Sequence, residues 1–333
     1  MAPETERDPN ELILQTWASC KARPNPVKLY RSDTEEKARR EQLKWRKRIS
    51  FVELDCGDDS FFVANTYKSI GIADGVAGWR DEGYDPSAFA NTLMKNAKHF
   101  CETHRTIANP ETILINAFGR LKHDKDVVGS STATCASIVD QVGQEATLAI
   151  ANLGNNGALV VRNREVVDRA HEKSHGINLP FQLAVVPPNF PHDCQQDSVH
   201  DSVRESFKVQ EGDVVVLGTD GLFENRFPSE IAAQAGWVGT VHKSAYDSIP
   251  LVGGVLKAAF GPDHRMEYTD PYRVTQRVVT EAFQAATSRH STTPWSAMLK
   301  QFDIDHEGGK MDDITVLVAR VTTRGKAERT SMW

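Results

Sequence analysis

The run Ser69-Ile-Gly-Ile-Ala73, followed directly by Asp74-Gly75, decides the fold. A short uncharged run containing two isoleucines is typical of a buried β-strand. Glycine directly after the aspartate permits a sharp turn and close approach of the backbone. The carboxylate of Asp74 is therefore expected at the edge of a sheet, where it can face a ligand.

The same arrangement occurs at two other places in the chain. The apolar run 214–218 leads to Asp220-Gly221, and Asp312-Asp313 directly precedes the run 314–321. In an antiparallel sheet the start of one strand lies beside the ends of its neighbours. We therefore expect these aspartates to share one rim, which Asp58-Asp59, before a further strand, would join.

Clustered aspartates with a free backbone carbonyl suit a hard cation such as Mg²⁺ or Mn²⁺, which takes oxygen ligands and keeps several waters. A single Asp-Gly pair is more often an ordinary turn. Two such pairs after apolar strands, together with Gly308-Gly309 leading into paired aspartates, favour a metal site over isolated turns.

The order of predicted elements indicates an α+β protein with antiparallel sheets covered by helices, because strands and helices come in separate groups. Asp85-Pro86 and Asn109-Pro110 each supply an N-cap and a proline that begin a helix. Further helices are predicted over 229–235 and 272–286. Strands are predicted over 49–54, 60–64, 69–73, 132–139, 147–153, 158–161, 213–218 and 314–321.

Composition and charge exclude several function classes. With 39 basic and 45 acidic residues the net charge is −6, which does not suggest a nucleic-acid binder. No run approaches the roughly 18 apolar residues of a membrane-spanning helix. The first ten residues carry acids and no apolar signal region. We expect a soluble intracellular protein without a membrane span.

Three parts of the chain are expected: an N-terminal extension over 1–48, a folded domain over 49–322 and a tail over 323–333. The extension ends in the segment 37–48, which holds seven basic residues and one glutamate. This segment is either a docking or targeting patch or the solvated face of a helix. The five cysteines, widely spaced and odd in number, favour reduced thiols over a zinc site: Cys20, Cys56, Cys101, Cys135 and Cys194.

Taken together, these motifs resemble those of the metal-dependent (PPM, type 2C) serine/threonine protein phosphatases. The residues within the motifs are most similar to those of the T-cell-activation-type branch. The likeness covers most of 49–321. It rests on Gly57-Asp58-Asp59, Gly71-Ile-Ala-Asp74-Gly75-Val-Ala-Gly78-Trp79, Gly129-Ser-Ser-Thr-Ala133, Ala151-Asn-Leu-Gly154, Gly212-Asp213, Thr219-Asp220-Gly221-Leu-Phe and Gly308-Gly-Lys-Met-Asp312-Asp-Ile-Thr315.

The resemblance implies a four-layer α-β-β-α sandwich with two Mg²⁺ or Mn²⁺ ions per active site at one edge. It implies that Asp74 bridges both metals, that the Gly75 carbonyl binds one of them, and that Asp220 and Asp312 complete the other. Asp58 and Asp59 would act through bound water. A hydroxide bridging the two metals would then hydrolyse phosphoserine or phosphothreonine in protein substrates.

Three positions depart from the family pattern. Val76 stands where many members have a histidine that serves as general acid, so water or the substrate's surroundings must supply that proton. Leu54 stands where a phosphate-binding arginine is usual, and Arg80 is a candidate replacement or a solvated surface residue. Asn155 stands where an aspartate helps to hold a third metal, leaving Asp220 and Glu224. Because an amide is a poorer ligand for a hard cation, we expect weak occupancy of that third site.

Two functions remain open at this point. One is an active phosphatase, expected to be a monomer whose partners are phosphoprotein substrates. The alternative is a catalytically attenuated PPM scaffold that binds partners, which the three departures motivate. The acidic start favours cytoplasm or nucleus, whereas the family branch includes mitochondrial members. The segment 237–269 is an apparent insertion, either a lid or a solvent loop.

Overall fold

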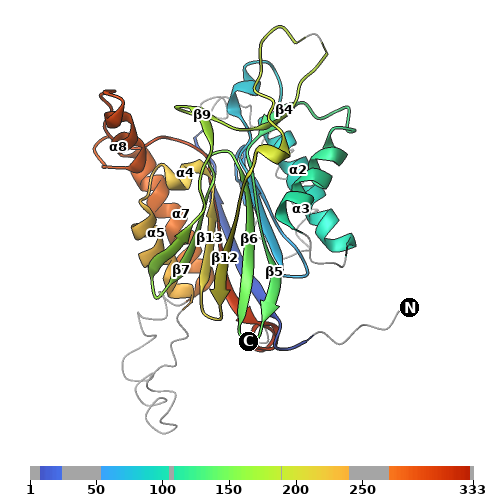
Figure 1. Ribbon diagram of the computed structural model, residues 1–333. Coiled ribbons are helices and arrows are strands. Elements are labelled where there is room, and N and C mark those ends of the chain that lie inside the picture. Colours follow the sequence, from blue (N-terminus) through green and yellow to red (C-terminus); the bar gives the residue numbers. More distant parts are fainter. Residues whose placement is uncertain (1–7, 25–53, 105–108, 189, 240–269, 331–333) are drawn as a thin grey trace, which may run out of the picture.

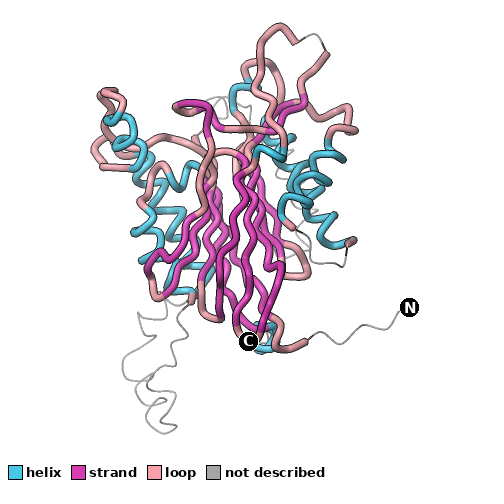
Figure 2. The backbone as a smooth tube through the Cα atoms, in the orientation of Figure 1, coloured by secondary structure: helices cyan, strands magenta, loops and turns pink. Residues whose placement is uncertain are grey.

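Two five-stranded antiparallel sheets stacked face to face form the centre of the computed structural model, with helices on both outer faces (Figure 1). The structure describes residues 8–24, 54–104, 109–188, 190–239 and 270–330. The strands lie together in the middle, and the long helices flank them on two sides (Figure 2). The predicted four-layer α-β-β-α sandwich of the α+β class is confirmed.

Each sheet combines strands from distant parts of the sequence. The first sheet has the order β1 (Leu12–Lys21), β14 (Ile314–Thr323), β13 (Val214–Gly218), β7 (Gly157–Arg162), β8 (Glu165–Arg169). The second has the order β12 (Val203–Gln210), β6 (Glu145–Leu153), β5 (Ala133–Val142), β3 (Ser69–Ala73), β2 (Ser60–Val63). Two short pairs join β4 (Gly129–Ser131) to β11 (Leu183–Val185) and β9 (Ser174–Gly176) to β10 (Leu179–Pro180).

Helices α2 (Pro86–Thr103) and α3 (Pro110–Leu121) cover the second sheet, while α5 (Pro228–Ala235) and α7 (Pro271–Thr287) cover the first. The predicted caps are present: Asp85 and Asn109 accept from backbone N–H groups at 3.0 and 2.9 Å. The other helical segments are η2 (Ala77–Arg80), η3 (Val199–Asp201), α4 (Asp220–Phe223), η4 (Gly236–Val238), α8 (Pro294–Gln301) and α9 (Arg324–Thr330). No helix in the described part of the chain is long and apolar enough to cross a membrane.

The core follows from the alternation of side chains along each strand. Ile70 and Ile72 of β3 belong to the apolar layer between the sheets, which Leu317 of β14 also joins. Val316 and Val318, the neighbours of Leu317 along β14, belong instead to the layer under α5 and α7. Because both faces of the central strands are buried, these strands read as continuous apolar runs.

Strand β1 corrects the predicted start of the folded domain. Residues 12–21 lie within the expected extension, yet they pair with β14 along their full length, from Leu12 opposite Thr323 to Lys21 opposite Ile314. Leu12 and Leu14 are fully buried in the layer between the sheets. The predicted basic segment 37–48, residues 49–53 of the first predicted strand and residues 240–269 of the insertion lie outside the described residues.

The predicted C-terminal tail also begins inside the fold. Thr323 is the last residue of β14, and the buried Arg324 donates from Nε and Nη2 to Glu11 Oε2 at 2.9 and 2.7 Å. The two ends of the described chain are thus joined to each other beside the first sheet.

Cys20 and Cys56 form a disulfide, which corrects the expectation of reduced thiols at these two positions. The bond joins Cys20, near the end of β1, to Cys56 in the loop before β2. Cys101, Cys135 and Cys194 are free thiols. The disulfide therefore links the end of strand β1, in the first sheet, to the loop that leads into strand β2, in the second sheet.

Reduction of this disulfide is expected to lower the free energy of unfolding by about 2–4 kcal/mol, because the unfolded chain regains conformational entropy. Denaturant unfolding with and without reductant measures the change. A Cys20→Ser/Cys56→Ser variant serves as control, since its unfolding should not respond to reductant. Identical midpoints for the wild-type protein in both conditions would show that the bond contributes nothing to stability.

Candidate metal centre

The predicted aspartates meet at one end of the sandwich, the end at which α4 lies in Figure 1. Antiparallel pairing causes this, since Gly218 of β13 lies opposite Val316 of β14 and Ser60 of β2 lies opposite Ala73 of β3. Each acidic residue stands directly beyond these strand ends: Asp74 after β3, Asp220 after β13, Asp312 and Asp313 before β14, and Asp58 and Asp59 before β2.

Hydrogen bonds between the sheets join these strand ends. The hydroxyl of Thr219 donates to Asp59 Oδ2 at 2.9 Å, and the N–H of Asp58 donates to Asp313 Oδ2 at 3.0 Å. Gly57 has a φ of 68°, and a Cβ there would lie 2.1 Å from Asp313 Oδ1, so this approach requires glycine. The acidic rim, called the carboxylate seam below, is thus a junction of both sheets.

Gly75 stands where its carbonyl is left out of the sheet pairing. Its isolated bridge to Ser131 is made by the carbonyl of Asp74, which accepts at 3.0 Å, and the N–H of Val76, which donates at 3.0 Å. The carbonyl oxygen of Gly75 takes part in neither bond. It is therefore a neutral oxygen that could serve as a ligand.

A lysine lies among three acidic residues of the seam. Lys310 Nζ is 2.8 Å from Asp220 Oδ2, 2.6 Å from Glu224 Oε2 and 3.3 Å from Asp312 Oδ2. Only 14% of the Lys310 side chain is exposed, so these ion pairs form away from bulk water. The ammonium neutralises part of the charge on carboxylates that come from α4 and from the start of β14.

Two arginines reach the opposite part of the seam. Arg23 Nη2 lies 2.8 Å from Asp58 Oδ2 and Nη1 lies 3.2 Å from Asp312 Oδ1, while its backbone N–H donates to Asp313. Arg80 Nη2 lies 2.5 Å from the other oxygen of Asp58. Arg80, predicted as a phosphate-binding residue, is therefore at the seam, with Arg23 as an unexpected second guanidinium.

Burial, and then the charges of neighbouring carboxylates, oppose the ionisation of these carboxyl groups. Burial, and then the charge of Asp220, raises the pKa of Asp74 well above its usual range. Burial and the neighbouring Asp313 do the same to the pKa of Asp59. Burial and Asp220 raise the pKa of Asp312 to about 6 and that of Glu224 to about 8. Added cations would relieve this repulsion.

The residues present fit divalent cations in donor type and in charge. Oδ1 of Asp59, Asp220 and Asn155 is buried without a hydrogen-bond partner among the described residues. No three acidic, histidine or cysteine side chains in those residues converge into a ready-made metal site. The seam brings together seven carboxylates and three cationic side chains, an excess of four negative charges when all are ionised, which is the charge of two divalent ions.

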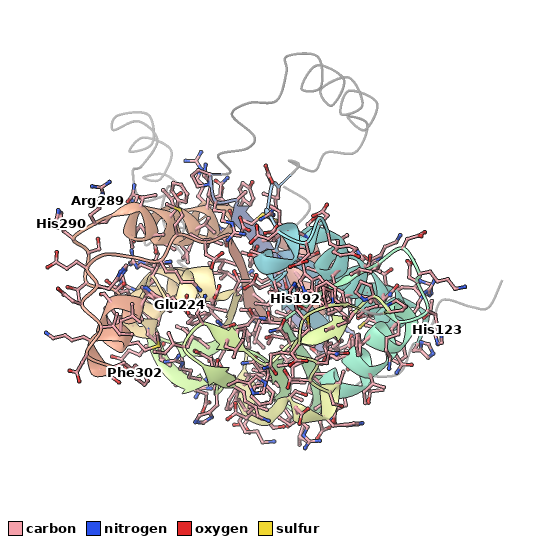
Figure 3. The ribbon with its side chains drawn as sticks, turned by 90° about the horizontal axis from the view of Figure 1, so that it is seen from above. His123, His192, Glu224, Arg289, His290 and Phe302 are labelled. Atoms are coloured by element: carbon pink, nitrogen blue, oxygen red, sulfur yellow. A yellow bond between two sulfur atoms is a disulfide. The ribbon has the colours of Figure 1, made fainter. Side chains whose placement is uncertain are left out.

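Asn155, predicted as a weak ligand for a third metal, turns its amide toward the seam. Its Nδ2 donates to Asp220 Oδ2 at 3.0 Å, the same oxygen that Lys310 contacts. Glu224 lies well inside the outline of the molecule when it is seen from above, whereas Phe302 and His290 lie at the periphery (Figure 3). Asn155 and Glu224 are thus both at the seam, one bonded to Asp220 directly and the other linked to it through Lys310.

Sequence reasoning missed three participants: Arg23, Thr219 and Lys310. Thr219 and Lys310 stand inside quoted motifs, so their proximity to the aspartates was available as a signal. Arg23 gave no such signal, because its partner Asp312 is 289 positions away. All predicted site residues are brought together at the seam.

Metal affinity at this seam is expected to increase as the pH rises from about 5 to about 7. A cation competes with the proton on Asp312, whose pKa is about 6, and this proton is lost as the pH rises above that value. Without metal the same raised pKa makes the folded state less stable as the pH passes from the usual carboxyl range to above 6. Calorimetric titration with Mn²⁺ at pH 5, 6 and 7 measures the affinity, and a pH-independent value would contradict the assignment.

Comparisons with known proteins agree with this geometry. A family model described as Stage II sporulation protein E (SpoIIE) matches residues 76–245. The protein phosphatase PTC7 homolog of Xenopus laevis is 34% identical over 280 residues, which are 83% of this chain and 85% of the relative. The PTC7 homolog of Homo sapiens is 35% identical over 269 residues, covering 80% and 79% of the two chains.

Solved structures share the fold. The X-ray structure of the photosystem II phosphatase PBCP has a TM-score of 0.65 at 21% identity and covers 93% of this chain and 99% of that one. The catalytic domain of the serine threonine protein phosphatase PstP, in complex with two manganese ions, has a TM-score of 0.50 at 12% identity and covers 94% and 100%. At such identities the likeness concerns the fold alone.

Proposed function

Because the chain belongs to the family of metal-dependent (PPM, type 2C) serine/threonine protein phosphatases, we propose that the carboxylate seam is its active site. The meeting of Asp74, Asp220 and Asp312 from three separate strand ends carries the proposal. A module that only bound partners would gain nothing from burying like charges together, since their repulsion destabilises the fold. The substrates are phosphoproteins, as for any protein phosphatase.

Two Mg²⁺ or Mn²⁺ ions per active site are part of this proposal. Their ligands would be the carboxylates of Asp74, Asp220 and Asp312 and the carbonyl of Gly75. Asp58 and Asp59 would not contact the metals directly but would hold water molecules bound to them. The excess of four negative charges when all the acids of the seam are ionised, together with its unpartnered carboxylate oxygens, supports two divalent ions.

When bound, such ions lower the pKa of an attacking water molecule and neutralise charge on the phosphoryl group. The chain's own residues hold the ligands in position. Thr219 fixes Asp59 from the opposite sheet, and Arg23 and Arg80 hold the two oxygens of Asp58 between them. The same guanidiniums are placed to bind phosphoryl oxygens, for which arginine's planar donors are suited.

One experiment tests the proposed activity. Purified protein is expected to hydrolyse a phosphothreonine peptide with Mn²⁺ or Mg²⁺ and to lose that activity in chelator. Activity that survives chelation would contradict the metal mechanism. Normal metal binding without hydrolysis would instead favour the attenuated scaffold, the alternative that Val76, Leu54 and Asn155 first suggested.

An Arg80→Ala variant is expected to bind inorganic phosphate roughly 10- to 100-fold more weakly, because a charged hydrogen bond contributes roughly 1.5–3 kcal/mol. The inhibition constant of phosphate in the peptide assay gives this value. Arg204→Ala is the matched control, since Arg204 is exposed on β12 and pairs with Glu111. Equal inhibition constants for both variants and the wild-type protein would remove Arg80 from the site.

The remaining expectations belong to the same proposal. We infer a monomer without nucleic-acid partners, which sedimentation of the purified protein measures. We also infer an intracellular location, in the cytoplasm or nucleus, with the mitochondrion as the family-based alternative. Fractionation of cells that express the tagged chain distinguishes these compartments.

A further inference from the structure

We propose that the ammonium group of Lys310 is a built-in cation that takes the place of a third metal ion, so that this phosphatase uses two metals and cannot load a third. This inference rests on the proposed function and adds the metal stoichiometry of the site. Its starting observation is the position of Nζ, within 3.3 Å of acidic oxygens of Asp220, Glu224 and Asp312.

The geometry around Nζ matches an ammonium group and not a metal ion. A lysine ammonium has three donors, and three carboxylates surround it here. Nζ donates a hydrogen bond to Asp220 Oδ2 at 2.8 Å and forms ion pairs with Glu224 Oε2 at 2.6 Å and Asp312 Oδ2 at 3.3 Å. Magnesium would require oxygens at about 2.1 Å. A divalent ion could enter only by displacing the lysine.

The lysine is held in this position by its backbone and its ring contact. The N–H of Lys310 donates to Asn225 Oδ1 at 2.9 Å, and Asn225 Nδ2 donates back to the carbonyl of Lys310 at 2.8 Å. Asn225 also donates to the carbonyl of Gly221, in α4, at 2.9 Å. Nζ lies 5.1 Å from the centre of the Trp295 ring. Lys310 is therefore fixed to α4, the element that carries Asp220 and Glu224.

Asn155 completes the argument from the other side. Its neutral amide donates to Asp220 Oδ2 at 3.0 Å, so this oxygen accepts from both Asn155 and Lys310. An aspartate in its place would face the Asp220 carboxylate and would add a fourth negative charge near Nζ. The amide and the ammonium thus form one arrangement, in which the ammonium neutralises one of the three negative charges near Nζ and the amide adds no fourth.

The number of Mn²⁺ ions bound per chain tests the proposal. Equilibrium dialysis against Mn²⁺ up to millimolar concentration, followed by elemental analysis, should give two ions for the wild-type protein. The Lys310→Met/Asn155→Asp variant should bind three, because its third site has lost the ammonium and gained a carboxylate. Asn155→Asp alone should still bind two, since Lys310 continues to fill the space.

Control variants separate charge from general damage. Lys310→Arg keeps a cation and is expected to bind two ions, as is Lys208→Met, whose lysine is exposed on β12 and bonds only to Thr147 among the described residues. Lys310→Met should also lower the melting temperature of the metal-free protein more than Lys208→Met does, because three carboxylates lose their cation. Differential scanning calorimetry in chelator measures this difference.

Several outcomes would overturn the inference. Three ions in the wild-type protein or in Asn155→Asp would show that Lys310 does not exclude a metal, even if the double variant fails to fold. Two ions in a folded double variant would show the same. A wild-type protein that binds at least two ions and hydrolyses phosphopeptide keeps the proposed function in each of these cases, whereas one that binds no Mn²⁺ contradicts both proposals.

Discussion

An Asp74→Asn variant is expected to lose more than about 100-fold in phosphatase activity, while its metal-free form stays as stable as the metal-free wild-type protein or becomes more stable. Loss of a residue that only hydrogen-bonds to a metal ligand typically lowers metal affinity or activity about 10–100-fold. Loss of a ligand at the centre of the seam should therefore lower activity more. Stability behaves in the opposite way because burial and Asp220 raise the pKa of Asp74, which means that its charge is unfavourable in the folded protein.

The two opposite effects distinguish a catalytic carboxylate from a structural one. Activity is measured on a phosphothreonine peptide with saturating Mn²⁺, and stability by calorimetry in chelator. Asp140→Asn, an exposed position on β5, is the matched control and should change neither quantity. A loss of activity that accompanies a large loss of metal-free stability would mean that Asp74 only supports the fold.

A Gly221→Ala variant is expected to lose about 3 kcal/mol of unfolding free energy and most of its metal affinity. A Cβ at position 221 would lie 2.0 Å from the carbonyl oxygen of Asp313, so α4 and the start of β14 must move apart. Overpacking typically costs about 1–3 kcal/mol, and the upper value applies here because the obstacle is backbone. The displacement would separate Asp220 from Asp312, which the metals require together.

Denaturant unfolding and calorimetric titration with Mn²⁺ measure these two effects. Gly119→Ala is the matched control, because nothing lies within 4 Å of a Cβ at that position in α3. Alanine inside a helix should make that variant slightly more stable, by up to about 1 kcal/mol. Equal stability of Gly221→Ala and the wild-type protein would show that the close contact at α4 is relaxed easily.

Much of the fold was predictable because its signals are local. Asp85-Pro86 and Asn109-Pro110 predict where α2 and α3 begin. Apolar runs that end in Asp-Gly predict strands β3 and β13. The identity of the seam carboxylates followed from the same local patterns. Antiparallel pairing then brought them together as expected.

The missed features depend on contacts between distant residues. Strand β1 pairs with a segment about 300 positions later, and nothing between Leu12 and Lys21 indicates that partner. The disulfide of Cys20 and Cys56 was equally inaccessible, because spacing alone does not determine pairing. Arg23 reaches the seam only because that strand and that bond place it there. The N-terminal boundary and the second guanidinium were therefore hidden for the same reason.

The pairing of β1 with β14 also bears on how the protein is made. At roughly 5–20 residues per second, a ribosome needs about 15–60 s to proceed from the first of these strands to the second. During that time the apolar side chains of Leu12, Ile13 and Leu14 have no partner strand, although they are buried once β14 is present. The nascent chain thus exposes an apolar segment early in synthesis. The first sheet can be completed only after β14 has left the ribosome.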